Sequence, residues 1–443
     1  MPYRYRSPRA IWVRLGRYID QLTTGGSWAV SLPPKTKHNL HWFWMDGLFS
    51  SPSDNIVVTY LVLFILALGA TRTQIGLMSA LSSLSITLVL LPGARLVERF
   101  GHRKWITVIA GGGIARLAIL FLVFLPMLLT GPVAVYIAIF LSVSRDAFSS
   151  FALPAWTSLS ADIVPLSWRG RYFASRNIIM GMGGIVITPI IGMIITSLGQ
   201  PIGYQIAFGL AFAIGMASTF SFSRIHEPPT MVLPKPTVQF SFSSLLKNLT
   251  TDTNFLALCI TAALWNFSLN IAGPFFNVYL VQNLQATATV IGFLSITSSL
   301  SGLPAQRILG ALADRFGPRK VQLVTGLLIP IVPWAWMFVK EPWQVFPINI
   351  MSGILWAGYS LASFNFFLSI TPEEQRARYS ALYQVIVTIA LAVGAILGSY
   401  LVTRWGYIII FACSGAGRLI SAILFTRFVH QPSSSSNEAE AAI

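Results

Sequence analysis

The chain has 443 residues, of which 54% are hydrophobic and only 10% are charged, and its formal net charge is +16 at pH 7. Soluble domains carry about 25% charged residues, so this composition excludes an ordinary water-soluble protein. It indicates a protein of the lipid bilayer, where apolar side chains face lipid or neighbouring helices.

Apolar segments long enough to cross a bilayer recur along the whole chain. In chain order they lie at 41–69, 75–94, 105–127, 133–161, 175–197, 203–222, 254–282, 288–306, 321–339, 344–370, 379–402 and 407–428. We therefore predict an all-α integral membrane protein with twelve transmembrane helices.

The remaining sequence divides this chain into five parts. A basic N-terminal tail occupies residues 1–40, and a six-helix half occupies 41–222. A proline-containing linker at 223–253 leads to a second six-helix half at 254–428. The end, 429–443, is rich in Ser and Glu, and we expect it to be disordered.

The positive charge is concentrated on one side of the predicted spans. With the N-terminus in the cytoplasm, 24 Lys and Arg residues lie in cytoplasmic segments and three lie in outer loops. This is the distribution that the positive-inside rule describes. We expect both termini and the linker to be cytoplasmic and the protein to reside in the plasma (inner) membrane. The rule explains the basic charge without a nucleic acid partner.

Two stretches of the chain are repeated. Residues 70–104 match residues 286–320 without a gap, and 16 of the 35 aligned pairs are identical. Residues 165–174 match residues 372–381 in the same way. A hydrophobic chain made of two homologous halves is typical of transporters that alternate access to a central site.

The first repeat ends in a charged loop. Residues 310–320 read Gly-Ala-Leu-Ala-Asp-Arg-Phe-Gly-Pro-Arg-Lys, which resembles the cytoplasmic loop signature of the major facilitator superfamily. Residues 94–104 are the less complete copy, with Ala for the leading Gly and Glu for Asp. The resemblance implies the fold of that superfamily and a cytoplasmic gate. Its residues would be Gly310, Asp314, Arg315, Gly317, Arg319, Lys320, Glu98, Arg99, Gly101, Arg103 and Lys104.

Four charged residues lie inside spans 1 and 4: Asp46, Asp54, Arg145 and Asp146. A charge within the bilayer is costly unless it is paired or hydrated, so such residues mark functional sites. The resemblance implies that spans 1, 4, 7 and 10 line the central cavity, which makes these four candidates for proton coupling. The alternative is a static ion pair between Arg145 and either Asp54 or Asp146.

Two further arginines, Arg116 and Arg418, lie on spans 3 and 12, which the resemblance implies stand outside the cavity. We interpret them as mainly structural, and the sequence names no partner for either.

Spans 7 and 10 carry polar and aromatic residues on one face, which suits a cavity for a partly apolar solute. The candidates are Asn266, Asn270, Asn277, Trp265, Trp356 and Tyr359. Hydrogen bonding between helices is the alternative role for these residues. The Gly273-Pro274 pair should interrupt the helix of span 7.

Span 5 keeps three of the five marked positions of the antiporter motif of this superfamily, at Gly184, Pro189 and Gly192.

The leading hypothesis is a proton-coupled secondary transporter that exports small amphipathic molecules. A solute symporter or uniporter is the alternative, followed by a non-transporting sensor or assembly factor. We expect no enzymatic activity, no cofactor or metal, and a monomer, and no ATP-binding sequence motif is present.

The charge asymmetry makes a topological prediction. In a background without Cys259 and Cys413, cysteines placed at Arg72 and Gln285 should react with membrane-impermeant thiol reagents added outside intact cells. Cysteines placed at His102 and Pro318 should react only after the membrane is permeabilised. External labelling at His102 would overturn the predicted topology.

Overall fold

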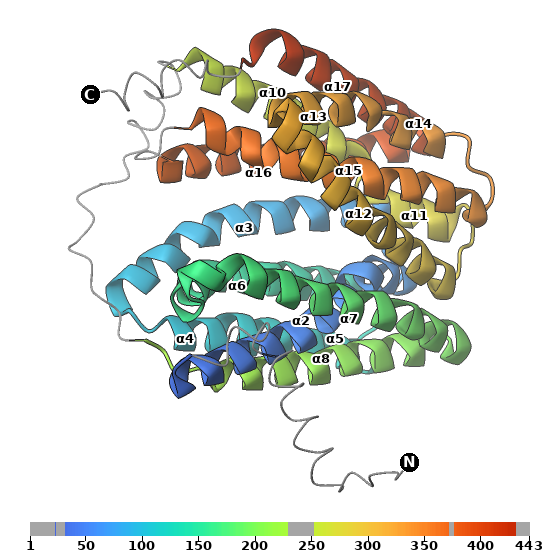
Figure 1. Cartoon of the computed structure of the whole chain (residues 1–443). Helices are drawn as coiled ribbons and strands as arrows, with labels where there is room; N and C mark the ends of the chain where they lie inside the picture. The colour runs from blue at the N-terminus through green and yellow to red at the C-terminus, as the bar shows by residue number, and fades with distance from the viewer. Residues whose placement is uncertain (1–22, 24–31, 229–251, 372–375, 431–443) are drawn as a thin grey trace, which may run out of the picture. The chain divides into compact units, whose positions relative to one another are not determined.

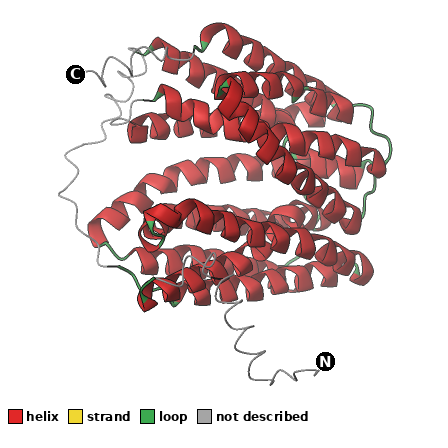
Figure 2. Cartoon of the chain, in the orientation of Figure 1, coloured by secondary structure: helices red, strands yellow, loops and turns green. Residues whose placement is uncertain are grey.

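The computed structural model describes residue 23 and residues 32–228, 252–371 and 376–430. Most of the predicted N-terminal tail, the linker and the C-terminal tail lie outside the described residues. Within the described part all regular secondary structure is helical and no strand is present (Figure 2). The predicted all-α membrane fold is confirmed, because eleven helical segments are long and apolar enough to cross a bilayer.

The described helices follow the predicted spans closely (Figure 1). Those of the first half are α2 (Pro34–Ala67), α3 (Arg72–Phe100), α4 (Arg103–Ile106), a π-helix (Thr107–Ile114), α5 (Ala115–Leu128), α6 (Gly131–Ile163), α7 (Arg169–Leu198) and α8 (Ile202–Ser223). Those of the second half are α10 (Thr253–Ala272), α11 (Phe275–Gln282), α12 (Ala288–Phe316), α13 (Pro318–Leu328), α14 (Ile331–Trp336), α15 (Val345–Ile370), α16 (Arg376–Trp405) and α17 (Tyr407–Phe428).

Proline explains where the helices depart from the prediction. Helix α2 begins at Pro34, inside the segment predicted as a tail, because proline is favoured in the first helical turn. The predicted span at 321–339 is divided into α13 and α14 at Pro330, which has no N–H to continue the helical ladder. The interruption predicted at Gly273-Pro274 is present between α10 and α11.

Residue contacts divide the chain into two units that do not coincide with the two sequence halves. The first unit comprises residues 1–61, 88–129 and 141–233, and the remaining residues form the second. The start of α3 belongs to the second unit, where it packs on α16. A side chain added at Gly76 would overlap Ser399, and Ala80 is buried against Ala392 and Ala395. Small residues permit this close approach of two membrane helices.

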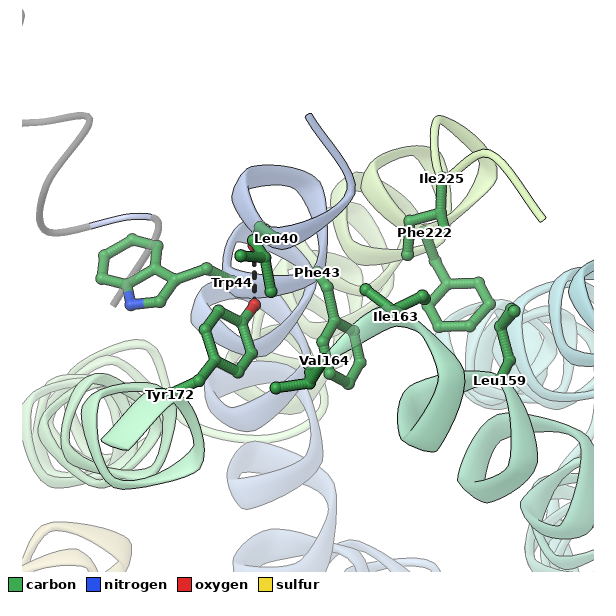
Figure 3. Packing of buried hydrophobic residues seen from close by; sticks show 9 residues of the cluster. All are labelled: Leu40, Phe43, Trp44, Leu159, Ile163, Val164, Tyr172, Phe222 and Ile225. Atoms are coloured by element: carbon green, nitrogen blue, oxygen red, sulfur yellow. Dashed lines mark hydrogen bonds between the residues drawn. The ribbon is translucent and has the colours of Figure 1, made fainter. Parts of the chain in front are cut away.

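Each unit contains an aromatic core at an equivalent place in the repeat. In the first unit Phe43 packs against Tyr172, whose hydroxyl donates a 2.6 Å hydrogen bond to the carbonyl of Leu40 (Figure 3). In the second, Phe255 packs against Tyr379. Phe255 lies 215 positions after Leu40, and Tyr379 lies 207 positions after Tyr172. The repeat seen in the sequence therefore extends to the packing.

An asparagine ties the first helix of each half to the segment after the sixth. Asn39 donates to the carbonyl of His226 and accepts from its N–H, both at 2.8 Å. Asn254 makes the same two bonds with His430, also at 2.8 Å. Each asparagine thus satisfies both backbone groups of one residue beyond the end of a helix, where no helical partner is available.

We expect Asn39→Ala and Asn254→Ala each to lower the free energy of unfolding by about 1–3 kcal/mol, because two hydrogen bonds are lost at once. Thermal unfolding of the purified protein in detergent, followed by tryptophan fluorescence, measures the effect. Asn283→Ala is the control, since Asn283 follows the last residue of α11 and is exposed. Equal midpoints for Asn39→Ala and the control would contradict the assignment.

Candidate functional site

Asp54 on α2 lies between two guanidinium groups. Its Oδ1 accepts a 2.8 Å bond from Nη1 of Arg116 on α5 and a 3.3 Å contact from Nη2 of Arg145 on α6. The Arg116 and Arg145 side chains are 10% and 12% exposed, whereas that of Asp54 is 46% exposed. One accessible carboxylate is therefore shared by two nearly buried cations.

Each of the two arginines also keeps a second partner. Arg145 donates from Nη1 to Asp146 at 3.0 Å, and Arg116 donates from Nη1 to the hydroxyl of Ser53 at 2.8 Å. The two ion pairs that the sequence analysis gave as the alternative role of Arg145, with Asp54 or with Asp146, are both present. The sequence offered no partner for Arg116. In the structure Arg116 makes the shorter of the two contacts to Asp54.

A second carboxylate of α2, Asp46, precedes Asp54 in the chain and forms a more deeply buried ion pair. It accepts from Nη2 of Arg176 at 2.8 Å and from the hydroxyl of Ser218 at 2.7 Å. The Arg176 guanidinium also lies 4.3 Å from the centre of the Phe43 ring, a cation–π contact. Arg176 is one of the 24 Lys and Arg residues that the sequence analysis assigned to cytoplasmic segments, and its pairing with Asp46 was not predicted.

Glycine provides the room for both buried arginines. A Cβ added at Gly47 would lie 2.8 Å from Nε of Arg176, and one added at Gly215 would lie 2.8 Å from Nε of Arg116. Gly47 follows Asp46 directly. An acidic residue next to a glycine on a membrane helix was therefore the feature of the sequence that could have indicated a long cationic side chain packed against α2 at this point.

The two carboxylates line one cavity inside the first unit. Its volume is about 310 Å³, and Asp46, Asp54, Arg116 and Arg176 lie on its wall with apolar side chains such as Trp156. Part of the wall is the π-helix, a form that is frequent at functional sites. The cavity is large enough for several waters or a small solute.

The predicted cavity residues of the second half are brought together only in part. Trp265 and Tyr359 stack with their ring centres 4.6 Å apart, and Trp356 contacts both rings edge-on. Asn270 instead donates to the carbonyl of Leu391 at 2.7 Å.

Two of the asparagines predicted for the same cavity are placed differently. Asn266 donates to the carbonyl of Ala262 in its own helix, and Asn277 is half-buried on α11. Asn266 thus makes a hydrogen bond within its own helix. Asn270 makes a hydrogen bond between helices, which was the alternative role given for these residues. The three aromatic residues form one cluster.

The first loop copy forms ion pairs. Arg103, which is 3% exposed, contacts the carboxylates of Asp162 and Glu227. Glu227 also accepts from the backbone N–H groups of Arg103 and Lys104, at 2.8 and 3.3 Å. These are the first amides of α4, where a carboxylate is favoured by the helix dipole. Arg103 thereby joins the start of α4, the end of α6 and the segment after α8.

The second loop copy makes different contacts. Arg319 donates to the carbonyls of Val429 and Thr426 at the end of α17, at 3.0 and 2.9 Å. Asp314 is exposed, and no hydrogen bond or ion pair joins it to another described residue. Gly310 lies against α15, where an added Cβ would be 3.2 Å from Leu361.

The other predicted gate residues fall into two groups. Gly101 and Gly317 adopt φ values of +67° and +89°, which only glycine adopts freely, so each makes the turn between two helices. The exposed cations Arg99 and Arg315 and the half-buried Lys104 lie over neighbouring rings. Lys320 is exposed, and the side chain of Glu98 lies outside the described part of the structure.

An all-helical membrane protein with two repeated halves and buried ion pairs beside a cavity is organised as a transporter. Residues 47–279 and 256–442 match the family profile of the Major Facilitator Superfamily. The chain therefore belongs to the major facilitator superfamily and is a multi-pass integral membrane protein.

Relatives in this family include efflux pumps. The chain is 24% identical over 388 residues to the multi-drug resistance efflux pump PmrA of Streptococcus pneumoniae, covering 85% of this chain and 92% of that protein. It is 23% identical over 372 residues to the PmrA homolog of Lactococcus lactis subsp. lactis, covering 82% and 88%.

Solved structures of low sequence identity share the fold. A transporter of the POT family in complex with 5-aminolevulinic acid has a TM-score of 0.69 at 13% identity, covering 93% of this chain and 99% of that chain. An inward-facing bacterial homolog of the lysosomal transporter Spinster has a TM-score of 0.64 at 13% identity, covering 91% and 100%.

The unequal loop contacts predict unequal effects. Arg103→Gln should reduce transport at least about tenfold at equal expression, since it leaves two carboxylates near the membrane surface without their cation. Arg319→Gln should reduce transport less, because it removes only bonds to backbone carbonyls. Uptake or efflux assays at matched protein levels compare the two. A greater loss in Arg319→Gln would contradict this ranking.

Proposed function

We propose that this protein is a proton-coupled exporter of small amphipathic molecules in the plasma membrane, acting as a monomer. The observation that carries the proposal is the position of Asp54. It is a carboxylate within the membrane region, it is accessible, and two cations compete for it.

Protonation of Asp54 would remove the negative charge that Arg116 and Arg145 share. Arg145 would retain its ion pair with Asp146, and Arg116 would retain its hydrogen bond to the neutral hydroxyl of Ser53. The two arginines would then hold the three helices α2, α5 and α6 less tightly together. A proton can therefore select between two arrangements of these helices, which is what coupling to a gradient requires.

Asp46 fits a second, more slowly exchanging proton site on the same cavity. It is only 6% exposed and is held by Arg176 and Ser218. Because Asp46 and Asp54 line one cavity, water within it can connect them for proton transfer.

The substrate class rests on two lines of support. The PmrA relatives are multi-drug efflux pumps, and the second unit contributes an aromatic cluster of Trp265, Trp356 and Tyr359. Flat aromatic surfaces beside a few polar groups favour amphipathic solutes over sugars or simple ions.

The decisive variant is Asp54→Asn. It should abolish proton-driven accumulation of a fluorescent amphipathic dye in inside-out vesicles, with a loss of at least about tenfold, because no proton can exchange at an amide. Downhill exchange of preloaded dye should persist, since the shape of the site is retained.

Asp146→Asn is the matched control, because Asp146 contacts Arg145 but leaves both contacts to Asp54 intact. We expect it to keep more than half of the driven accumulation. Driven transport at the wild-type rate in Asp54→Asn would refute coupling at this residue. A protein that moves dye only downhill in every form would instead be a uniporter.

A further inference from the structure

Each of the two units contains a cavity at the same place in the repeat. A serine contact identifies this place: Ser218 donates to Asp46 in the first unit, and Ser421 donates to the carbonyl of Thr261 in the second. These positions are related by 215 residues on the first helix of each half and by 203 on the sixth. A cavity of about 310 Å³ lies beside the first contact, and one of about 20 Å³ lies beside the second.

A glycine contact confirms the correspondence on two further helices. A Cβ added at Gly111 in the π-helix would lie 3.1 Å from Cβ of Ala152 on α6. One added at Gly326 on α13 would lie 3.4 Å from Cε2 of Tyr359 on α15. Ala152 and Tyr359 are 207 positions apart, the interval that also separates the tyrosines of the two aromatic cores. Both cavities are therefore bounded by the same pairs of helices.

Aromatic side chains occupy the space in the second unit. Trp265 and Tyr359 stack and line the smaller cavity, and Trp356 packs edge-on against both. The corresponding positions of the first unit hold small residues that line the larger cavity: Ser50, Ser149 and Ala152. The two cavities differ in volume because the second half supplies rings at these positions and the first half does not.

The walls of the larger cavity suit a flat group. Gly111 and Gly112 leave the backbone of the π-helix without side chains, and Trp156 and Phe222 contribute aromatic rings to the lining. A planar ring packs closely against such surfaces, and aromatic pairs gain more than their buried area alone provides. A volume of about 310 Å³ is at the lower end of the range for small-molecule sites, which limits the group to one or two fused rings.

Asp54 provides a hydrogen-bond acceptor on the wall of this cavity. Both arginine contacts are made to its Oδ1, and its Oδ2 accepts no hydrogen bond from a described residue. A carboxylate oxygen accepts strongly from an amine or another N–H group. A ligand with such a donor next to its ring therefore finds a partner here.

We propose that the cavity of the first unit binds a planar aromatic group of one or two fused rings that carries an N–H donor. The ring takes the place that Trp265 and Tyr359 fill in the second unit, and the N–H donates to Asp54. This inference rests on the proposed function, because the aromatic group belongs to the exported solute. It adds where the solute is held and which chemical group is recognised.

The first test compares two amines that differ in the flatness of their rings, naphthylmethylamine and its fully saturated analogue decahydronaphthylmethylamine. Isothermal titration of the purified full-length protein in detergent, corrected with a detergent blank, measures both affinities. We expect the flat amine to bind at least about tenfold more tightly, because a saturated ring is too thick to make the same contacts. Partition into detergent or a nonspecific apolar surface favours the saturated amine instead. Equal affinities, or tighter binding of the saturated amine, would overturn the proposal.

The second test introduces the residues of the second half into the first. Ser50→Trp and Ala152→Tyr should each weaken binding of naphthylmethylamine at least about tenfold, since the new ring takes the place of the ligand. Gly111 leaves room for the tyrosine as Gly326 does for Tyr359.

Ser50→Ala and Ala152→Ser are the matched controls, and they should bind within about twofold of the wild type. Wild-type affinity in a folded Ser50→Trp or Ala152→Tyr would refute the site. If neither variant folds, the comparison of the two amines on the wild type decides.

The binding assays contain no proton gradient, so this site and the proposed function fail separately. Proton-driven export of dye by a protein that does not prefer the flat amine would refute the site alone. A preference for the flat amine that Ser50→Trp removes, without driven export in vesicles, would refute the proposed function alone.

Discussion

The cost of placing a charge within the membrane is the constraint that shapes this protein. Every buried guanidinium of the first unit has a partner within that unit: Asp54 for Arg116 and Arg145, Asp46 for Arg176, and Asp162 with Glu227 for Arg103. Removing one member strands the other in a low-dielectric environment. These pairs therefore bind helices together.

The two halves have diverged in their use of charge while keeping their packing. The aromatic cores, the asparagine bonds and the serine contacts between first and sixth helices recur in both. The carboxylates do not: the positions of Asp46, Asp54 and Asp162 are taken by Thr261, Leu269 and Ser369 in the second half. The carboxylates that pair with buried arginines are thus concentrated in one half, and the aromatic cluster of Trp265, Trp356 and Tyr359 lies in the other.

The fold could be predicted from sequence because hydrophobic length, charge asymmetry and repetition are properties of whole segments. Single contacts were less accessible. Asp54 and Arg145 were found because an intramembrane charge is rare, but Arg176 was missed because it lies only seven residues after the start of α7 and resembled a loop cation. The second loop copy matches the family signature better, yet the first forms the ion pairs, since Asp162 and Glu227 lie far from it in sequence.

The π-helix at residues 107–114 sets the direction in which Arg116 points. Backbone bonds in a π-helix run from residue i to i+5, so each residue turns less around the axis than in an α-helix. The angle between Arg103 at the start of this span and Arg116 near its middle therefore depends on the wider turns between them. Shortening the Gly111–Gly113 run by one residue would tighten those turns and rotate Arg116 away from Asp54. The π-helix therefore lies between the loop ion pairs at Arg103 and the contact of Arg116 with Asp54, and it connects the geometry of the two.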